Sequence, residues 1–486
     1  MEEIPLGKKK ENGGLKLDYK KTILTGFGFL ATSIAWAIYD PYITKILNNL
    51  LSNSSTVTAW SNWLVEKLPI LTKFAEAQGE NVALVGGGFT LVPLFIGIIM
   101  TFDNIFGVIF QPTFGKLSDN CHSKLGKRRP FIVIGAPISA VLFFLIPIVF
   151  LNTHSLPLTM VFIILFVFVM SLWRAPIVAL MPDLTPPALR SEGNAVINLM
   201  GAFGGLYTLI MMKVAVTTDA AGNANYTALF ASVAGLMVTA IAILVLTIRE
   251  KKLVAEMKAI NYGVNEDEDQ GKTETVNGKE KLPKPVLKSL LLILTTIGLW
   301  FLGYNAVTTF FTSYATATWS GGLSHASTCL MVATVAAVAS YIPIGMISAK
   351  IGRRNMIRIG LLTAAAGFAV ATFCAREFSF YLYIVFAVVG FAQASVTVNT
   401  FPMVWEISRS GNVGKYTGFD YTVSMTAQTV TPFLVGIFLD KLGNDALFPY
   451  GLVFVLLALI PISLAKHGDN RPEAPKSKLE AFDVDD

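Results

Sequence analysis

The fold is decided by Gly115-Lys-Leu-Ser-Asp119, followed closely by Leu125-Gly-Lys-Arg-Arg129. The same pattern recurs in the second half of the chain as Gly345-Met-Ile-Ser-Ala-Lys350-Ile-Gly-Arg-Arg354. Each copy closes one long apolar run with a glycine and opens the next with a basic cluster. Two parallel copies of a helical membrane unit are typical of secondary transporters, whose binding site lies between the copies.

The composition excludes a soluble globular protein. The chain has 486 residues, of which 53% are hydrophobic and 14% are charged, whereas soluble domains carry about 25% charged residues. The charges gather in short stretches, and the apolar runs between them reach the roughly 20 residues that cross a bilayer as a helix. The net charge of +6 does not predict a nucleic-acid partner, because the basic residues lie at helix ends, where they orient a membrane protein.

We therefore expect an all-α integral membrane protein with twelve transmembrane helices in two six-helix halves. Its predicted parts are a first half (1–248), a cytoplasmic linker (249–286), a second half (287–466) and a cytoplasmic tail (467–486). The predicted spans cover about 22–47, 90–115, 130–151, 158–182, 193–214, 227–248, 287–315, 326–349, 356–375, 380–405, 417–439 and 446–465.

Orientation follows from the 38 Lys and Arg residues. Almost all of them lie on the side that holds both termini, and this side is expected to be cytoplasmic. The exceptions are Arg174, which lies inside a span, and six residues on the other side: Lys45, Lys67, Lys73, Lys213, Arg376 and Lys441.

One segment on the outer side, 52–85, has its large apolar residues at helical spacing. It predicts a short amphipathic helix on the membrane surface, which either packs over the external loops or acts as a lid. The residues that carry this pattern are Trp60, Trp63, Leu64, Leu68, Leu71 and Phe74.

Three ionisable residues lie well inside predicted spans, where charge is costly and usually functional. They are Asp40 in the first span, Asp103 in the second and Arg174 in the fourth. A carboxylate beside an arginine can exchange its proton as the partner moves, which predicts proton coupling. The same three residues could instead form a permanent structural ion pair.

Sugar binding needs amides for the hydroxyls and aromatic rings for the apolar face of the ring. Trp300, Tyr304 and Asn305 share one face of the seventh span and predict such a site. Single amides in other spans are further candidates, although they often join helices instead. The full set is Asn104, Gln111, Asn194, Asn198, Trp300, Tyr304, Asn305, Gln393, Asn399 and Gln428.

The repeated basic clusters are expected to hold helix ends together and to act in gating. They comprise Gly115 with Arg128 and Arg129, and Arg353 with Arg354 in the second copy. Their expected partners are Asp119, Asp183 and Glu406.

Nothing in the sequence predicts an enzyme, a cofactor or a metal site. The four histidines lie in loops or at span ends without metal-ligand spacing, and no nucleotide-binding motif is present. The three cysteines show no metal-binding or redox spacing.

With these residues in view, the chain resembles the glycoside–pentoside–hexuronide and sucrose:proton symporter group of the major facilitator superfamily. The resemblance covers nearly the whole length. It rests on Gly126-Lys-Arg-Arg-Pro-Phe131, Arg174-Ala-Pro176, Asp103-Asn104, Gln111-Pro-Thr-Phe-Gly115 and Pro402-Met-Val-Trp-Glu406, with Gly414-Lys-Tyr-Thr-Gly418 after it.

The chain departs from its melibiose-type sodium-coupled relatives at the cation site. The resemblance aligns the aspartates of that cation site with Gly107, Gln111 and Arg174 of this chain. Sodium prefers oxygen ligands and would be repelled by a fixed positive charge, so the resemblance implies proton coupling. Plant-type sucrose carriers have an acid in the outer fourth span that this chain lacks, which leaves Asp103 as the expected proton carrier and Asp40 as the second choice.

We expect a monomeric proton-coupled symporter that imports a disaccharide or small α-glucoside of the sucrose or maltose type across a bacterial inner membrane. One alternative is a proton-coupled efflux antiporter for a small organic molecule. Gly201-Ala-Phe-Gly-Gly205 argues against it, because it lacks the proline typical of such exporters. The other alternative is a non-transporting sugar sensor. Such sensors usually resemble a transporter with a long added cytoplasmic domain, whereas the predicted cytoplasmic tail covers only 467–486.

Overall fold

The computed structural model describes residues 7–9, 15–67, 92–218, 224–260, 274–276, 279–320, 322–407 and 412–469, and it is nearly all helical. The long helices of the first half are α1 (Tyr19–Ser52), α4 (Val92–Asp119), α5 (Arg129–Thr153), α6 (Leu156–Leu184), α7 (Arg190–Val214) and α8 (Thr227–Thr247). Those of the second half are α10 (Lys284–Thr318), α11 (Gly322–Ile351), α12 (Arg353–Cys374), α13 (Tyr381–Ile407), α14 (Val413–Leu442) and α15 (Leu447–Leu464).

Within the described ranges, eleven of these helices are long and apolar enough to cross a membrane. The twelfth, α4, is a helix of 28 residues. The predicted all-α architecture of twelve membrane-length helices is confirmed.

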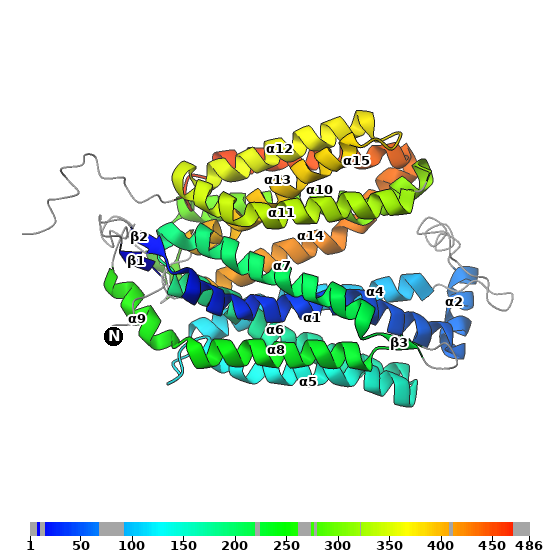
Figure 1. Cartoon of the computed structure of the whole chain (residues 1–486), viewed down its shortest axis with the longest axis horizontal. Coiled ribbons are helices and arrows are strands. Elements are labelled where there is room, and N and C mark those ends of the chain that lie inside the picture. Colours follow the sequence, from blue (N-terminus) through cyan, green and yellow to red (C-terminus); the bar gives the residue numbers. More distant parts are fainter. Residues whose placement is uncertain are drawn as a thin grey trace, which may run out of the picture.

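The two halves pack their helices in the same order. In the first half, α1 packs against α7 and α8, α5 against α6 and α8, and α4 against α6. In the second half, α10 packs against α14 and α15, α12 against α13 and α15, and α11 against α13. The halves meet where α4 packs against α14 and where α7 packs against α11. The two contacts are equivalent in the repeat, because each joins the second long helix of one half to the fifth of the other. Figure 1 shows the two helix groups one above the other, with α7 and α14 between them.

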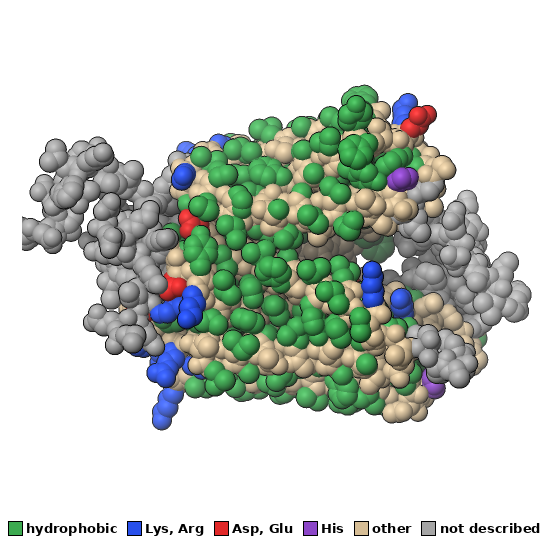
Figure 2. Space-filling model, in the orientation of Figure 1, with side chains coloured by type: hydrophobic (Ala, Val, Ile, Leu, Met, Phe, Trp, Pro, Cys, Tyr) green, Lys and Arg blue, Asp and Glu red, His purple; other side chains and the backbone are tan. Residues whose placement is uncertain are grey.

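Each half has an apolar core built around closely packed aromatic rings. The ring centroid of Phe143 lies 4.4 Å from that of Phe230 in the first half, and Phe311 lies 4.4 Å from Phe386 in the second. All four side chains are buried. Figure 2 shows many more apolar side chains on the outside of the bundle, with the charged ones near its two ends. An apolar surface of this extent is what contact with lipid requires.

Shorter elements lie at the two ends of the bundle. They are α2 (Ser55–Lys67), α9 (Glu250–Ile260), two 3₁₀ turns at Pro187–Leu189 and Asn444–Ala446, and three antiparallel hairpins: β1–β2 (Gly7–Lys9, Leu15–Leu17), β3–β4 (Thr217–Thr218, Ala224–Asn225) and β5–β6 (Glu274–Val276, Lys279–Lys281).

The predicted surface helix within 52–85 is partly confirmed. Helix α2 covers its first part, and Trp60 and Trp63 are exposed on it. Leu68, Leu71 and Phe74 lie outside the described residues.

We call the basic end the end of the bundle where α4, α6, α11 and α13 finish and α5, α7, α12 and α14 begin. Helix α9 and the β1–β2 hairpin lie at this end, on the left of Figure 1.

At the basic end, the acid Glu250, which follows α8, caps the N-terminus of α5, the third long helix of the first half. The Glu250 carboxylate accepts hydrogen bonds from the backbone N–H groups of Lys127, Arg128 and Arg129, at 2.6, 3.0 and 3.0 Å. The first N–H groups of a helix have no partner within it, so a buried carboxylate there satisfies them and complements the helix dipole. The Arg129 side chain also donates to the Val245 carbonyl at 2.6 Å, which ties α5 to the end of α8.

The second half repeats this arrangement. Asp469, which follows α15, accepts a hydrogen bond from the backbone N–H of Arg353 at 2.7 Å. The Arg354 side chain donates to the Ala465 carbonyl at 2.7 Å. The second arginine of each cluster therefore holds the third and sixth helices of its own half together.

Replacing Glu250 with glutamine is expected to lower the melting temperature of the purified protein by several degrees. Glutamine keeps the size of the side chain but loses the charge and one acceptor oxygen, and hydrogen bonds to a charged group contribute about 1.5–3 kcal/mol. Glu256→Gln on the same helix is the matched control, because among the described residues the one ion pair of Glu256 is with Lys252, at 4.0 Å. Equal melting temperatures for the two variants would contradict a capping role.

Candidate functional site

A cavity of about 530 Å³ lies between the two halves. Its volume falls within the roughly 300–1,000 Å³ of small-molecule sites. Figure 2 shows the surface hollowed between the halves toward the end opposite the basic end. The cavity is lined by Trp36 and Asp40 of α1, Met100 and Asn104 of α4, Arg174 of α6, Phe301, Asn305 and Thr309 of α10, Phe401 of α13, and Asp420, Tyr421, Ser424, Met425 and Gln428 of α14.

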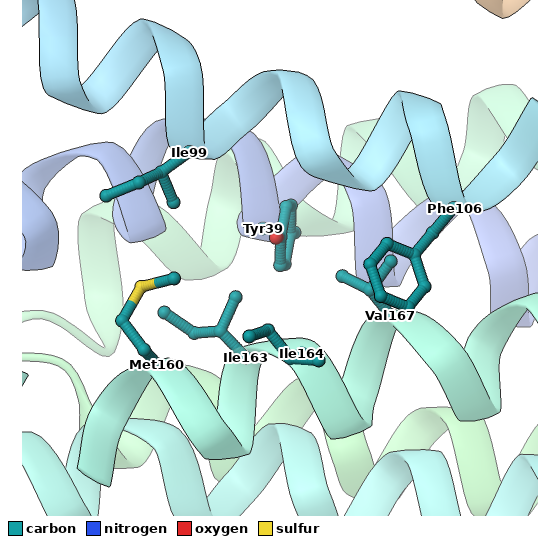
Figure 3. A pocket seen from close by; sticks show the side chains of 7 residues that line it. All are labelled: Tyr39, Ile99, Phe106, Met160, Ile163, Ile164 and Val167. Atoms are coloured by element: carbon teal, nitrogen blue, oxygen red, sulfur yellow. The ribbon is translucent and has the colours of Figure 1, made fainter. Parts of the chain in front are cut away.

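A second, much smaller crevice lies where α1, α4 and α6 meet (Figure 3). Its volume is about 10 Å³, and six of its seven lining side chains are apolar. Tyr39 is the exception, and its ring stacks on buried Phe166 at 5.5 Å. This crevice has room for about one water molecule, so the larger cavity is the candidate site.

Arg174 bridges the two halves at the cavity. Its guanidinium carbon lies 5.0 Å from the ring centroid of Trp36 in the first half and 4.7 Å from that of Tyr421 in the second. A guanidinium over an aromatic face is attracted by the ring, most strongly where water is excluded. Arg174 therefore links α6 to α14 through a contact that must change if the halves move apart here.

Two carboxylates share the cavity with Arg174. Asp40 is close enough to Arg174 to interact with it electrostatically. Asp420 is only 3% exposed, and its Oδ1 has no hydrogen-bond partner among the described residues. Among the described residues, the cavity lining thus holds one fixed positive charge and two acids, a pattern that suits proton exchange.

On α10, the cavity-lining face lies one residue beyond the predicted one. Phe301, Asn305 and Thr309 line the cavity at intervals of four residues. Trp300 and Tyr304 stack on each other, with centroids 5.1 Å apart, and neither lines the cavity. Trp300 is buried in the apolar core of the second half, so Asn305 is the member of the predicted cluster that the structure places in the cavity.

The other predicted amides divide between the cavity and the helix packing. Asn104 lines the cavity, whereas Gln111 is buried with its amide nitrogen 3.7 Å from the sulfur of Met425. Asn198 donates to the Asn194 carbonyl, and Asn399 to the Ser395 carbonyl. Asp103 lies on α4, but its side chain is outside the described part of the structure.

Sequence reasoning missed the α14 face of the cavity, apart from Gln428. Asp420, Ser424 and Gln428 recur every four residues, with Tyr421 and Met425 beside them. Asp420 fell at the end of the predicted span 417–439, whereas α14 begins at Val413 and carries it two turns inside. The polar residues at helical spacing were the signal that could have identified this face.

At the basic end, Arg128 joins the ends of three helices. Its side chain is 1% exposed and pairs with Asp119 at 2.5 Å and with Asp183 at 2.8 Å. It also donates to the Ser118 hydroxyl at 2.5 Å. Burial lowers the pKa of Arg128, but Asp183 and Asp119 raise it by more, and the net shift is upward. The arginine is therefore charged and fully paired, as the sequence predicted for these partners.

Asp119 extends this network across the interface between the halves. Its two oxygens accept hydrogen bonds from the backbone N–H groups of Gly414 and Lys415, both at 2.9 Å. These are N–H groups of the first turn of α14, so a carboxylate of the first half caps a helix of the second half.

The second copy of the motif makes different contacts because its acid is missing. Ala349 stands at the position equivalent to Asp119. Arg353 pairs with Glu406 within its own half and reaches across the interface to the Ser191 hydroxyl at 2.9 Å and to the Pro187 carbonyl. The two copies thus both join the halves, the first through Asp119 and the second through Arg353 itself.

Arg190, which the sequence analysis did not single out, adds a further bond across the same interface. It is 9% exposed and donates to the Trp405 carbonyl at 3.2 Å and to the Pro182 carbonyl at 3.3 Å. Together with Asp119 and Arg353, Arg190 joins the two halves at the basic end and closes this end of the cavity.

Gly115 lets the backbones of α4 and α14 touch. A Cβ at Gly115 would lie 2.1 Å from the Gly414 carbonyl oxygen, and one at Gly414 would lie 2.4 Å from the Gly115 oxygen. Any larger side chain would therefore push the two helices apart.

Gly115→Ala is expected to slow solute uptake by roughly tenfold, which corresponds to about 1.4 kcal/mol. The added methyl group cannot fit beside the Gly414 backbone, so the closed basic end is destabilised. Gly235→Ala is the control, because nothing lies within 4 Å of its Cβ position. Initial uptake rates in proteoliposomes provide the measurement, and a Gly115→Ala rate equal to that of the control would show that the close approach is dispensable.

The fold and this site define a multi-pass membrane transporter with a central cavity closed at one end. The sequence model of the MFS/sugar transport proteins matches residues 89–407. The chain belongs to this family of the major facilitator superfamily.

Solved transporters of this superfamily share the fold. The proton:xylose symporter XylE bound to 6-bromo-6-deoxy-D-glucose aligns with a TM-score of 0.60 at 14% identity, over 93% of this chain and 97% of that one. The human organic anion transporter MFSD10 (TETRAN) gives 0.58 at 16% identity, over 93% and 100%. FucP in the outward conformation gives 0.55 at 12% identity, over 92% and 100%. At these identities the likeness establishes the fold and leaves the solute open.

Proposed function

We propose that this chain is a proton-coupled symporter that imports a disaccharide or small α-glucoside of the sucrose or maltose type by alternating access. In this proposal, residues 1–248 and 287–466 move against each other, 249–286 links them in the cytoplasm, and 467–486 is a cytoplasmic tail. The transporter works as a monomer in a bacterial inner membrane.

The cavity is the observation that carries the proposal. Asn104, Asn305 and Gln428 offer amides that can donate to and accept from sugar hydroxyls. Trp36 and Phe301 offer rings for the apolar face of the sugar. The described lining has one arginine and two acids, so it offers no surplus positive charge to an anionic solute, which favours a neutral sugar carried with a proton.

The direction follows from charge. Lys and Arg favour the cytoplasmic side, so the basic end faces the cytoplasm and the cavity opens to the outside. The arrangement described above is then the state that receives solute from outside, with the Arg128 and Arg353 contacts as its inner gate.

Coupling is assigned to the acids near Arg174. Asp40 lies in the cavity beside this arginine, and Asp103 keeps the role proposed from sequence. The fixed positive charge of the guanidinium repels Na⁺, which also needs several oxygen ligands. We therefore expect uptake that depends on a proton gradient and is indifferent to sodium.

Uptake of radiolabelled sucrose and maltose into proteoliposomes with an imposed inward proton gradient tests the proposal. Accumulation of either sugar that a protonophore abolishes, and that sodium does not change, is the expected result. Accumulation that requires sodium would contradict the role of Arg174. Proton-driven loss of solute from the vesicles would favour an efflux antiporter.

A further inference from the structure

We propose that Asp420 is a proton-binding group of the second half, which carries a coupled proton between the two sides of the membrane. This inference rests on the proposed symport and adds a coupling residue to it. It places one proton site on α14, opposite the acids that the sequence suggests on α1 and α4.

The first argument is the surroundings of the carboxylate. Asp420 lines the cavity and is only 3% exposed. Its Oδ1 is buried and has no hydrogen-bond partner among the described residues. None of the ion pairs of the described Lys and Arg residues involves Asp420. A buried carboxylate without a partner must bind a proton or acquire a positive neighbour. The geometry therefore favours a protonated Asp420 in this state.

The second argument is the neighbouring residue. Tyr421, directly after Asp420, holds the guanidinium of Arg174 at 4.7 Å across the interface. When the halves rearrange, α14 shifts relative to α6, and the position of Arg174 relative to Asp420 changes with it. Approach of Arg174 stabilises the carboxylate and releases its proton to water, whereas withdrawal favours proton uptake.

Among the described residues, few other ionisable groups lie near α14, and the two acids among them are already paired. The helices packed against α14 contribute Arg174 from α6, Asp119 from α4 and Glu406 from α13, together with Tyr304 from α10 and Tyr450 from α15. Asp119 and Glu406 pair with Arg128 and Arg353 at the basic end. Across the cavity, Asp40 of α1 is the other described acid of the lining.

Infrared spectroscopy of the purified full-length protein tests proton binding without requiring a known solute. A protonated carboxylic acid has its own carbonyl-stretch band, and we expect part of this band to disappear in Asp420→Asn. Asp445→Asn is the matched control, because Asp445 is 62% exposed and lies 3.7 Å from Arg376. Asp420→Glu should retain the band and shows whether loss in Asp420→Asn reflects the carboxyl group and not misfolding.

The transport assay separates this inference from the proposed function. Asp420→Asn should lose proton-driven accumulation of sugar while retaining sugar exchange across the vesicle membrane. An unchanged infrared band, or full accumulation by the variant, would overturn the inference even if the wild type is a proton symporter. If the wild type accumulates no sugar, the symport proposal fails, and the infrared result alone decides whether Asp420 binds a proton.

Discussion

Replacing Arg174 with glutamine is expected to abolish proton-driven accumulation of sugar, leaving uptake at the level of empty liposomes. Arg174 supplies the only described positive charge of the cavity lining and holds the rings of Trp36 and Tyr421. A desolvated guanidinium–ring contact contributes about 2 kcal/mol. Glutamine removes both contacts and leaves Asp40 without its positive neighbour.

Arg174→Lys distinguishes the two roles of this residue. Lysine keeps the charge but lacks the planar group that can stack between two rings. If charge alone matters, Arg174→Lys should recover most of the accumulation. If the bridge between the halves matters, it should behave like Arg174→Gln. Normal accumulation by Arg174→Gln would remove Arg174 from the coupling mechanism.

The measurement is the steady-state sugar gradient in proteoliposomes, compared with sugar exchange in the absence of a proton gradient. Exchange reports solute binding and the movement of the halves, whereas accumulation also requires coupling. Loss of both would place Arg174 in the movement itself, and loss of accumulation alone would place it in coupling.

The helical architecture was readily predicted from sequence because lipid imposes simple rules. A helix that crosses the membrane must be long and apolar, so the runs of apolar residues mark the spans directly. The ends were less well predicted. Helix α1 begins at Tyr19 and α10 ends at Thr318, since polar residues can continue a helix beyond the hydrocarbon core.

The cavity lining was predicted only in part. Successive side chains of a helix point about 100° apart, so an error of one residue selects a different face. Trp300 and Tyr304 were chosen for their chemistry, but the next residues, Phe301 and Asn305, face the cavity. Sequence alone does not show which stripe of an almost wholly apolar helix faces the partner half.

The contacts of Asp119 were also predicted only in part, because some of them are made with distant backbone groups. Its pairing with Arg128 follows from the motif, since the two residues lie in one loop region. Its bonds to Gly414 and Lys415 join residues almost 300 positions apart, and their donors are backbone groups that any sequence would supply. No residue pattern indicates such a contact.

Replacing Asp119 with asparagine is expected to shift the transporter toward a state that is open at the basic end. Asp119 is the acid that both pairs with Arg128 and caps α14. Asparagine keeps the shape but loses the charge and one acceptor oxygen, and each hydrogen bond to a charged group contributes about 1.5–3 kcal/mol. A loss of about 1.4 kcal/mol already changes an equilibrium tenfold.

Spin labels at Lys124 and Lys350, both exposed, would report the separation of the halves at the basic end. We expect Asp119→Asn to populate longer distances than the wild type. Asp183→Asn is the matched control, because Asp183 pairs with the same arginine at 2.8 Å but within its own half. Both variants remove one carboxylate from Arg128, so both should destabilise the fold.

The two variants separate the local network from the gate. If Arg128 pairing alone keeps the basic end closed, Asp119→Asn and Asp183→Asn will open it equally. If the cap on α14 keeps the basic end closed, only Asp119→Asn will open it, since among the described residues Asp183 bonds to Arg128 and to no residue of the second half. The asymmetry of the repeat supports the second outcome: Ala349 replaces the equivalent acid, and there Arg353 itself crosses the interface. We therefore expect the Asp119 bonds of the first copy and the Arg353 bonds of the second both to stabilise the closed basic end, so that losing either set should shift the transporter toward the open state.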